Sequence, residues 1–296
     1  MTDTHLGEPT SPIDYLVIGH VAKDLTPSGP RLGGTVSYSG LTASALGWRT
    51  GLVTACDSDL DLSSLAGLAR HCVASPASTT FENIYGPAGR QQYLRAEAAA
   101  LPFSAVPVAW RSAPIVHFGP IAHELSAETV LALAGAAPDR LIGMTPQGWL
   151  RQWNKAGVVR PAAWPEALGT FSKVTAMVLS IEDVQGDWPL LHRWAGAVPN
   201  LVVTQGALGC TVFVRGQPPR TFAPPLEVET DPTGAGDIFA AAFFIGLHEN
   251  RDPYAAAQFA NRVAAQSVTR VGLAGVPTPA EVQLLRQPPP AEAAPA

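Results

Sequence analysis

Short apolar runs bounded by glycine or polar residues recur along the chain and predict the buried strands of a sheet. They lie at Tyr15–Ile18, 51–55, Ile115–Phe118, Leu141–Met144, 176–179 and 201–204. Helical patterns separate most of these runs, as at residues 38–46, 126–136 and 189–197. Apolar strands that alternate with helices are typical of a parallel sheet covered on both faces. The pattern therefore predicts an α/β fold with a mostly parallel central sheet.

Two stretches interrupt this alternation. Residues 24–32 are short and rich in proline and glycine, and residues 78–95 mix polar with apolar positions. The second stretch predicts a β-hairpin that turns at Gly86-Pro-Ala-Gly89. An insertion of this kind between α/β units suits a lid over an active site, and a surface hairpin without function explains the pattern equally well. Another hairpin is expected from residues 211–214 and 221–228.

The composition supports a large apolar core. Of the 296 residues, 47% are hydrophobic and 15% are charged, which suits one large α/β domain or two small ones. The formal net charge of −5 and the lack of a Lys/Arg cluster argue against a nucleic-acid-binding surface. We therefore expect a globular body and no nucleic-acid partner.

The sequence gives no indication of a membrane segment or of secretion. The polar, acid-containing residues 1–12 do not resemble a signal peptide, and the most apolar helix candidate, residues 238–247, is too short to span a bilayer. Cys56, Cys72 and Cys210 are far apart without metal-binding spacing, which predicts free thiols in a reducing compartment. We expect a cytoplasmic protein with no membrane partner.

The segment Asp231-Pro-Thr-Gly-Ala-Gly-Asp237 opens into an apolar helical run and is the strongest chemical signal in the chain. Because Gly234, Ala235 and Gly236 leave the backbone bare, their amides can converge on an anion at the start of the following helix. Asp237 stands where that negative charge would arrive. An acid there is a poor phosphate ligand and a good base for a hydroxyl during phosphoryl transfer. These four residues are the catalytic candidates.

The glycine pattern alone also permits a simpler interpretation, because an Asp near a helix start often serves only as a cap. The chain lacks Gly-x-x-x-x-Gly-Lys-Ser/Thr and, after its first strand, Gly-x-Gly-x-x-Gly, which argues against a P-loop enzyme and a Rossmann dehydrogenase. A hydrolase would lack its Gly-x-Ser-x-Gly nucleophile. His20, His117 and His123 lack the spacing of metal ligands and suit ordinary polar positions near strand ends.

The whole heptapeptide resembles the C-terminal signature of the ribokinase-like (PfkB) carbohydrate kinases, commonly Asp-Thr-x-Gly-Ala-Gly-Asp. Further segments that resemble the family occur in the family's order between Tyr15 and Gly272. The resemblance implies a three-layer α/β domain with a small β lid. It implies this division of the chain: one kinase domain over residues 13–285, lid segments at about 24–36 and 78–97, and flexible tails at 1–12 and 286–296.

Two N-terminal segments resemble the family's acceptor-binding motifs. Gly19-His-Val-Ala-Lys-Asp24 follows the first strand with the family's spacing, and there the acid binds acceptor hydroxyls. Taken by itself, without the resemblance, Asp24 is better explained as a turn residue. Gly33 and Gly34 resemble a Gly-Gly pair that lets the backbone approach a ligand closely. Tyr38 stands where the family usually has Asn, which is similar to the branch that includes plant myo-inositol kinases.

Two further segments resemble family motifs in the middle of the chain. Thr145-Pro-Gln147, followed by Arg151, occupies the place of a segment that often reads Asp-x-Asn with a following Arg, and Gln147 is its candidate substrate ligand. Residues 180–183 lie where the family has Asn-x-x-Glu, which helps to organise Mg²⁺ and phosphate through water. Glu182 and Asp183 are therefore the magnesium candidates. A helix N-cap followed by first-turn acids is an equally good interpretation.

The family's nucleotide-binding segments have counterparts near the C-terminus. Thr204-Gln-Gly206-Ala-Leu-Gly209 resembles a Thr-x-Gly-x-x-Gly loop whose glycines let the backbone pass over ribose and phosphates. Asn261 matches a helix that lines the adenine pocket. Thr233 is a further nucleotide-binding candidate, and Asp231 with Thr233 matches positions that hold K⁺ in some members, where the ion would stiffen the anion-binding loop.

These residues and the resemblance predict an ATP-dependent kinase that uses Mg²⁺, and K⁺ if Asp231 binds it. The expected acceptor is a hydroxyl of a small unphosphorylated polyol, sugar or nucleoside. The loops near the first strand offer only Lys23 and Arg31 for a phosphate on the acceptor. Myo-inositol is therefore the first choice, with ribose or a nucleoside after it.

The alternative is a non-catalytic sugar- or nucleotide-sensing protein on the same fold. The departures from the family at Tyr38, Gln147 and Ser180 favour this alternative. The intact Asp237 argues against it, because a protein that only binds has no need of a base. The resemblance also implies that the lid can pair two copies into a homodimer.

Overall fold

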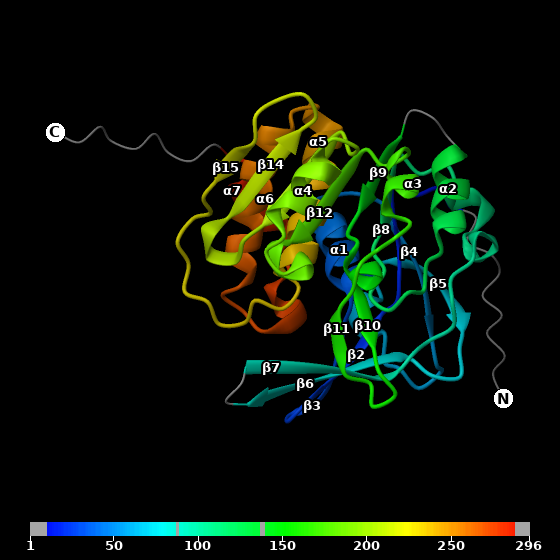
Figure 1. Cartoon of the computed structure of the whole chain (residues 1–296). Helices are drawn as coiled ribbons and strands as arrows, with labels where there is room; N and C mark the ends of the chain where they lie inside the picture. Colours follow the sequence, from blue (N-terminus) through cyan, green and yellow to red (C-terminus); the bar gives the residue numbers. More distant parts are fainter. Residues whose placement is uncertain (1–10, 87–88, 137–139, 288–296) are drawn as a thin grey trace.

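The computed structural model describes residues 11–86, 89–136 and 140–287 and contains a large α/β body with a smaller sheet beside it (Figure 1). The body is built on one sheet with helices on both faces, and the smaller sheet extends from one end of it. This arrangement confirms the predicted α/β fold with a mostly parallel sheet and a β lid. The tails expected at residues 1–12 and 286–296 lie largely outside the described residues.

The central sheet is formed by β1 (Tyr15–Ile18), β4 (Thr50–Cys56), β5 (Ala69–Ala74), β8 (Ile115–Phe118), β9 (Leu141–Met144), β12 (Ala176–Ser180), β13 (Asn200–Thr204), β14 (Cys210–Val214) and β15 (Arg220–Phe222). Its order is β15-β14-β13-β12-β9-β8-β1-β4-β5. Neighbours from β13 to β5 pair in parallel, and β14 and β15 add an antiparallel edge. Because β1, β8 and β9 are buried along their whole length, they have continuous apolar sequences.

Helices cover the two faces of this sheet. One face carries α1 (Thr35–Ala45), α5 (Ala235–Asn250), α6 (Pro253–Ser267) and α7 (Pro279–Leu285), and the other carries α2 (Ala127–Gly135), α3 (Ala167–Phe171) and α4 (Trp188–Ala195). Successive side chains of β1 point alternately into the two cores on opposite faces of the sheet. Tyr15 and Val17 enter the core beneath α1 and α5, whereas Leu16 and Ile18 enter the core on the side of α2 to α4.

Helix α5 is buried between α1 and α6. Every residue from 238 to 247 is buried, which explains the apolar run in the sequence. The hydroxyl of Ser39 in α1 donates to the carbonyl oxygen of Asp237 at 2.9 Å and fixes the first turn of the helix. Within the described residues, no helix combines the length and apolar character needed to cross a bilayer.

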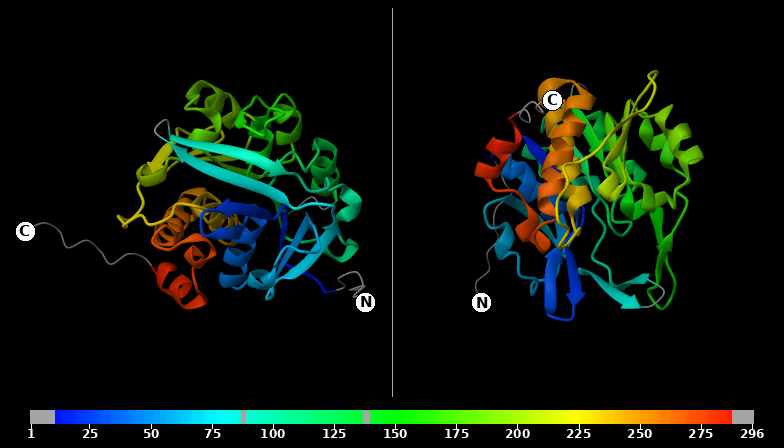
Figure 2. Two further views of the ribbon diagram at one scale, coloured as in Figure 1. Left: turned by 90° about the horizontal axis from the view of Figure 1, so that it is seen from below. Right: turned by 90° about the vertical axis from the view of Figure 1, so that its left-hand side faces the viewer.

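The smaller sheet, called the lid sheet here, contains β2 (Ala22–Thr26), β3 (Gly29–Gly33), β6 (Thr79–Gly86) and β7 (Gly89–Ala96) in the order β3-β2-β6-β7. Figure 2 shows these strands, in blue and cyan, apart from the body. The two predicted lid segments thus meet through the parallel pairing of β2 with β6. A short hairpin of β10 (Arg151–Trp153) and β11 (Val159–Pro161) contacts β7 through a bridge between Tyr93 and Val158.

Several element boundaries differ from the sequence-based expectation. Helix α1 begins at Thr35, before the expected residue 38, because Gly34 forms its N-cap. The predicted return arm to residue 228 ends at Phe222, since Pro224 and Pro225 cannot donate to a ladder. The β10–β11 hairpin was not predicted, because its three-residue strands carry no periodic signal. Short 3-10 turns are η1 (Ser63–Leu65), η2 (Phe103–Ala105), η3 (Val108–Trp110), η4 (Gln147–Leu150), η5 (Ile181–Val184), η6 (Gly206–Leu208) and η7 (Gly272–Gly275).

Candidate active site

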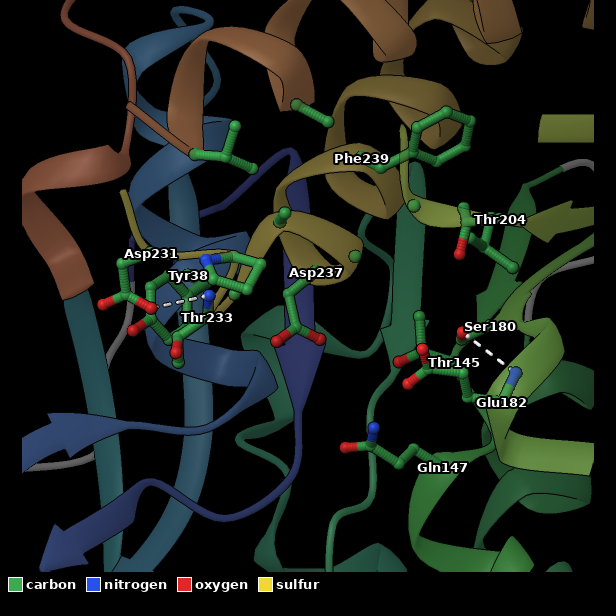
Figure 3. Close-up of a pocket in the computed structure, with 18 of the residues that line it drawn as sticks. Tyr38, Thr145, Gln147, Ser180, Glu182, Thr204, Asp231, Thr233, Asp237 and Phe239 are labelled. Atoms are coloured by element: carbon green, nitrogen blue, oxygen red, sulfur yellow. Dashed lines mark hydrogen bonds between the residues drawn. The ribbon is translucent and has the colours of Figure 1, made fainter. Parts of the chain in front are cut away.

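A cavity of about 640 Å³ lies where the carboxyl ends of the central strands face the lid sheet (Figure 3). Its walls come from the starts of α1 and α5, the ends of β12 and β13, and the lid strand β6. This edge of a parallel sheet is the usual ligand crevice of α/β folds. Most predicted site residues line it: Asp24, Gly34, Tyr38, Gln147, Glu182, Asp183, Thr204, Gly206, Gly209, Asp231, Thr233, Gly234, Ala235, Gly236, Asp237 and Asn261. Of the predicted set, only Gly33 is not part of this lining.

The anion loop, residues 231–237, places backbone amides at the start of α5. Gly234 is the N-cap of the helix and has a φ of 81°, a left-handed conformation that favours glycine. The amides of Gly234, Gly236 and Asp237 make no hydrogen bond to the described part of the chain, whereas Ala235 donates to a turn carbonyl at 3.2 Å. Unpaired amides at the positive end of a helix dipole favour an anion at this point.

Tyr38 of α1 forms the floor of the anion loop. It is buried, and its ring packs so closely against Gly234 that any side chain there would overlap the ring. Burial, followed by the charges of Asp24, Asp237 and Asp231, raises the pKa of the Tyr38 hydroxyl. Tyr38 therefore stays protonated and shapes the anion loop, in addition to facing the cavity.

Asp237 lies in the first turn of α5 and directs its carboxylate into the cavity (Figure 3). Burial raises the pKa of Asp237 to about 6, a hydrogen bond from Thr35 and the charge of Arg151 lower it, and the charge of Asp183 raises it. A carboxylate with this pKa is ionised at neutral pH and is a stronger base than an ordinary Asp. The group is therefore suited to take a proton from an alcohol.

Asp231 braces the anion loop from its outer side. One carboxylate oxygen accepts the amide of Thr233 and the other accepts the amide of Gly272, both at 3.0 Å. Burial acts to raise the pKa of Asp231, but the hydrogen bonds from Thr233 and Gly272 hold it below its usual value. The carboxylate thus ties the loop to the turn η7. Binding of K⁺ at this position stays a prediction.

Asp24 reaches the cavity from strand β2 of the lid sheet, where it lies in register with Phe81 of β6. Gly33 makes room for it, because a side chain on Gly33 would overlap the Asp24 carboxylate. Gly34 has a φ of 88°, and a side chain there would crowd the carbonyl of His20. The glycine pair therefore permits the close approach of β2, β3 and the start of α1 around this acid.

The lid sheet presents amide groups and an aromatic ring to the cavity. Asn83 of β6 and Gln92 of β7 are opposite each other, and Nε2 of Gln92 donates to Oδ1 of Asn83 at 3.2 Å. Phe81 lies on the same strand, and the guanidinium of Arg151 stands 5.7 Å from the centre of its ring. All four side chains line the cavity. This roof can form hydrogen bonds to several hydroxyl groups and pack against an apolar ring face.

The charge of the cavity wall is predominantly negative. Among its described lining residues, Arg151 is the one basic side chain, and the two cations suggested by the sequence, Lys23 and Arg31, do not line it. The acids of the wall are Asp24, Glu182, Asp183, Glu227, Glu229, Asp231 and Asp237. A polyphosphate would therefore need to bring bound cations that offset its repulsion by these carboxylates.

Ser180 and Asp183 form the capping box of η5, the simpler of the two interpretations of this segment. Oδ2 of Asp183 accepts the Ser180 amide at 3.0 Å, and Oδ1 accepts Nε2 of Gln147 at 3.3 Å. Glu182 lines the cavity beside them. The described residues contain no group of three His, Cys, Asp or Glu side chains that could hold a metal ion. The wall fits Mg²⁺ bound mainly by phosphates and water, with Glu182 or Asp183 outside the first coordination shell.

The end of the cavity near Thr204 and Asn261 is formed by loop backbone and apolar side chains. Thr204 ends β13, and Gly206 and Gly209 bound the turn η6 with φ values of 57° and 87°. Asn261 of α6 is buried, and its Nδ2 donates to the carbonyl of Phe222 at 2.9 Å. Apolar side chains complete this end: Pro224, Pro225, Leu226, Ala264, Ala265 and Val268. Such a surface can hold a flat ring.

Four uncharged polar residues of the wall were not assigned from the sequence: Thr35, Asn83, Gln92 and Thr145. Thr35 follows the glycine pair directly, and Thr145 directly follows an apolar strand, so both had a positional signal. Asn83 and Gln92 had none, because the register of β6 and β7 decides which side chains face the cavity.

Sequence comparison finds a matching family and related proteins for the C-terminal third of the chain. The model of the pfkB family carbohydrate kinases matches residues 189–280, which include the anion loop. Ribokinase of Bacillus subtilis (strain 168) is 42% identical over 88 residues, 29% of this chain and 29% of that protein. Inositol 3-kinase of Oryza sativa subsp. japonica is 39% identical over 89 residues, 29% of this chain and 21% of that protein. The matches thus span less than a third of either relative's length.

Solved structures share the fold over most of the chain. A pyrophosphate-dependent kinase in the ribokinase family, complexed with a pyrophosphate analogue and myo-inositol, has a TM-score of 0.73 at 20% identity and covers 86% of this chain and 94% of its own. Ribokinase of Arabidopsis thaliana, complexed with ribose and ATP, has a TM-score of 0.67 at 16% identity and covers 94% of this chain and 100% of its own. These likenesses establish the ribokinase fold, and the family model identifies the anion-loop segment. Residues 189–280 thus match the pfkB family of carbohydrate kinases, and most of the chain has the ribokinase fold.

Proposed function

We propose that the protein transfers a phosphoryl group from a nucleotide to a hydroxyl group of a small uncharged polyol or sugar. The observation that carries this proposal is that the Asp237 carboxylate and the unpaired amides of the anion loop face one cavity from adjacent residues. An acid beside an anion-binding site is repulsive where phosphate is only held. It is useful where a hydroxyl must lose its proton as a phosphoryl group arrives.

The residues of the chain divide the work between acceptor and phosphoryl group. Asp24 orients the acceptor by accepting hydrogen bonds from its hydroxyls. Asp237 takes the proton of the reacting hydroxyl, and the amides of Gly234 and Gly236 donate to the phosphoryl oxygens as negative charge develops there. The lid sheet excludes water, which would otherwise compete as the acceptor. When bound with the donor, Mg²⁺ supplies charge neutralisation that this acidic wall does not provide.

ATP is the donor that the cavity favours. The apolar side chains around Asn261, among them Pro224 and Val268, suit contact with an adenine ring and do not suit contact with pyrophosphate. One structural neighbour is pyrophosphate-dependent, and another was solved with ATP. We therefore propose ATP with Mg²⁺, and pyrophosphate is the alternative to be tested beside it.

A polyol such as myo-inositol is the first acceptor that we propose, followed by ribose. The Asn83–Gln92 amide pair and Asp24 offer several hydrogen bonds to hydroxyls. A phosphorylated acceptor would need basic side chains to bind its phosphate. Arg151 is the one basic side chain among the described lining residues, and its charge already acts on Asp237. Among the relatives, the rice protein is an inositol 3-kinase, and the pyrophosphate-dependent neighbour was complexed with myo-inositol.

A coupled assay tests the proposal and its non-catalytic alternative together. The full chain is incubated with Mg²⁺, either ATP or pyrophosphate, and a panel of myo-inositol, ribose, nucleosides and sugar phosphates, and phosphorylated product is measured. We expect turnover with ATP and an uncharged polyol or sugar. Saturable binding of donor and acceptor by calorimetry without any turnover would instead establish a sensing protein. Turnover with pyrophosphate alone would overturn the choice of donor.

A further inference from the structure

A buried chain of hydrogen bonds leads from the middle of the central sheet to the cavity. The Tyr15 hydroxyl on β1 is 2.8 Å from Nδ1 of His117 on β8, and Nε2 of His117 is 2.9 Å from the hydroxyl oxygen of Thr145. Tyr15 and His117 are 0% exposed, and Thr145 is 6% exposed and lines the cavity. Because β1, β8 and β9 are neighbours in the sheet, the backbone fixes the three side chains relative to one another.

The imidazole of His117 is uncharged at neutral pH. Its ring is fully buried and packs edge-on against the ring of Phe244, with 4.9 Å between the ring centroids. Burial lowers the pKa of His117 to about 3. A neutral imidazole has one nitrogen that donates and one that accepts. The chain of hydrogen bonds can therefore run in only one of two directions.

The buried Tyr15 hydroxyl selects the direction. Within the described residues, its one hydrogen-bond partner is Nδ1 of His117. If Nδ1 carried the proton, the hydroxyl hydrogen of Tyr15 would be buried without an acceptor, which is costly. Tyr15 therefore donates to Nδ1, and Nε2–H of His117 donates to Thr145. The hydroxyl oxygen of Thr145 thus accepts a hydrogen bond from His117. The hydroxyl proton of Thr145 must therefore point in another direction.

The free direction of the Thr145 proton is the cavity beside the base. Thr145 and Thr35 both flank Gly119, where an added methyl group would overlap Thr35 and come within 3.3 Å of the Thr145 hydroxyl oxygen. Thr35 in turn hydrogen-bonds to Asp237. In Figure 3, Thr145 lies between Asp237 and the pair of Ser180 and Glu182. Thr145, Glu182 and Asp237 all line the cavity in which phosphoryl transfer is proposed.

We propose that Thr145 donates a hydrogen bond to an oxygen of the phosphoryl group in transfer, and that His117 and Tyr15 are positioning residues that fix this direction. The proposal rests on the phosphotransferase function proposed above. A neutral donor suits this place, because the adjacent wall holds Asp237, Asp183 and Glu182 and would repel the developing charge. The fixed donor stabilises that charge without forming an ion pair with the base.

Steady-state kinetics of four variants test the proposal. Thr145→Val keeps the shape and removes the hydroxyl, so kcat should fall about 100-fold while the KM for the acceptor changes little. Thr145→Ser keeps the hydroxyl and should stay within about threefold of the parent. His117→Phe should lower kcat about tenfold, and the double variant with Thr145→Val should be no slower than Thr145→Val alone. Full kcat in Thr145→Val, or additive losses in the double variant, would overturn the proposal.

A measurement that needs no turnover separates this proposal from the function on which it rests. ¹⁵N NMR of the full chain with labelled histidines resolves the rings of the seven histidines, and loss of a signal in His117→Phe assigns it. We expect His117 to carry its proton on Nε2 throughout about pH 5 to 8. A proton on Nδ1 contradicts the proposed direction whether or not the protein turns over. The expected tautomer together with no phosphoryl transfer would count against the phosphotransferase function instead.

Discussion

The anion loop and the lid sheet face each other across one cavity, but they are built in opposite ways. The anion loop is seven consecutive residues, and its shape follows from local backbone geometry and the burial of α5 behind it. The cavity face of the lid sheet combines Asp24 with Phe81, Asn83 and Gln92, which meet only through strand pairing between distant segments. The comparison suggests that the chemical step depends on a local motif and that acceptor choice depends on a distributed one.

The largest effect that separates the two regions is expected from Asp237→Asn. This change keeps the size of the side chain and removes the base, so kcat should fall about 10³-fold while ATP still binds with nearly unchanged affinity. Rapid-quench turnover and calorimetry measure the two quantities. Asp59→Asn, on an exposed loop, is the matched control and should behave as the parent. Substantial kcat in Asp237→Asn would remove the base from the account.

The same substitution should stabilise the folded protein. The folded-state pKa of Asp237 is about 6, above the ordinary value of 3.8, so between these values the folded state binds more protons than the unfolded state. Stability contributed by this group is therefore present at low pH and is lost as pH rises through about 6. At pH 7, Asp237→Asn should raise Tm by a few degrees, about the shift expected for 1 kcal/mol. A lower Tm would contradict the assigned burial.

Gly234→Ala should damage the anion loop without touching the base. The φ of 81° disfavours alanine, and the methyl group would overlap the ring of Tyr38. We expect kcat to fall about 100-fold, as for loss of a donor in an anion site, and Tm to fall as well. Gly169→Ala, in α3 with open space around it, is the control. Unchanged kcat in Gly234→Ala would show that the loop does not set the rate.

Asn83→Leu tests the lid sheet. Loss of an amide that faces the cavity should raise the KM for the acceptor about tenfold, the equivalent of one hydrogen bond, while kcat changes much less. Ile84→Asn, on the other face of the same strand and 44% exposed, is the control. If Asn83→Leu lowers kcat and leaves KM unchanged, the division of labour between the two regions is wrong.

Glu182→Gln should have the smallest effect. One carboxylate outside the first coordination shell of Mg²⁺ contributes modestly, so the Mg²⁺ concentration for half-maximal rate should rise about threefold. Glu128→Gln, exposed on α2, controls for the loss of one negative charge. A requirement for Mg²⁺ that does not change would remove Glu182 from the metal site.

The same contrast between local and distributed structure limits what the sequence predicts. The apolar runs at β1, β8 and β9 gave the strand limits, because a fully buried strand leaves an unbroken signal. Asp237 and the anion loop were predicted because their chemistry is contiguous. Asn83 was not predicted, because its direction depends on pairing with a distant strand. His117 was interpreted as an ordinary polar residue, since its partners lie on two other strands.

The role of Asp237 as the catalytic base is tested by the pH dependence of kcat/KM. Asp237 must be ionised to accept a proton, and its pKa is about 6. We expect kcat/KM to fall about tenfold per pH unit below about 6, measured where circular dichroism shows the protein to be folded. A profile that stays flat down to about pH 4.5, as expected for an ordinary exposed carboxylate, would contradict it.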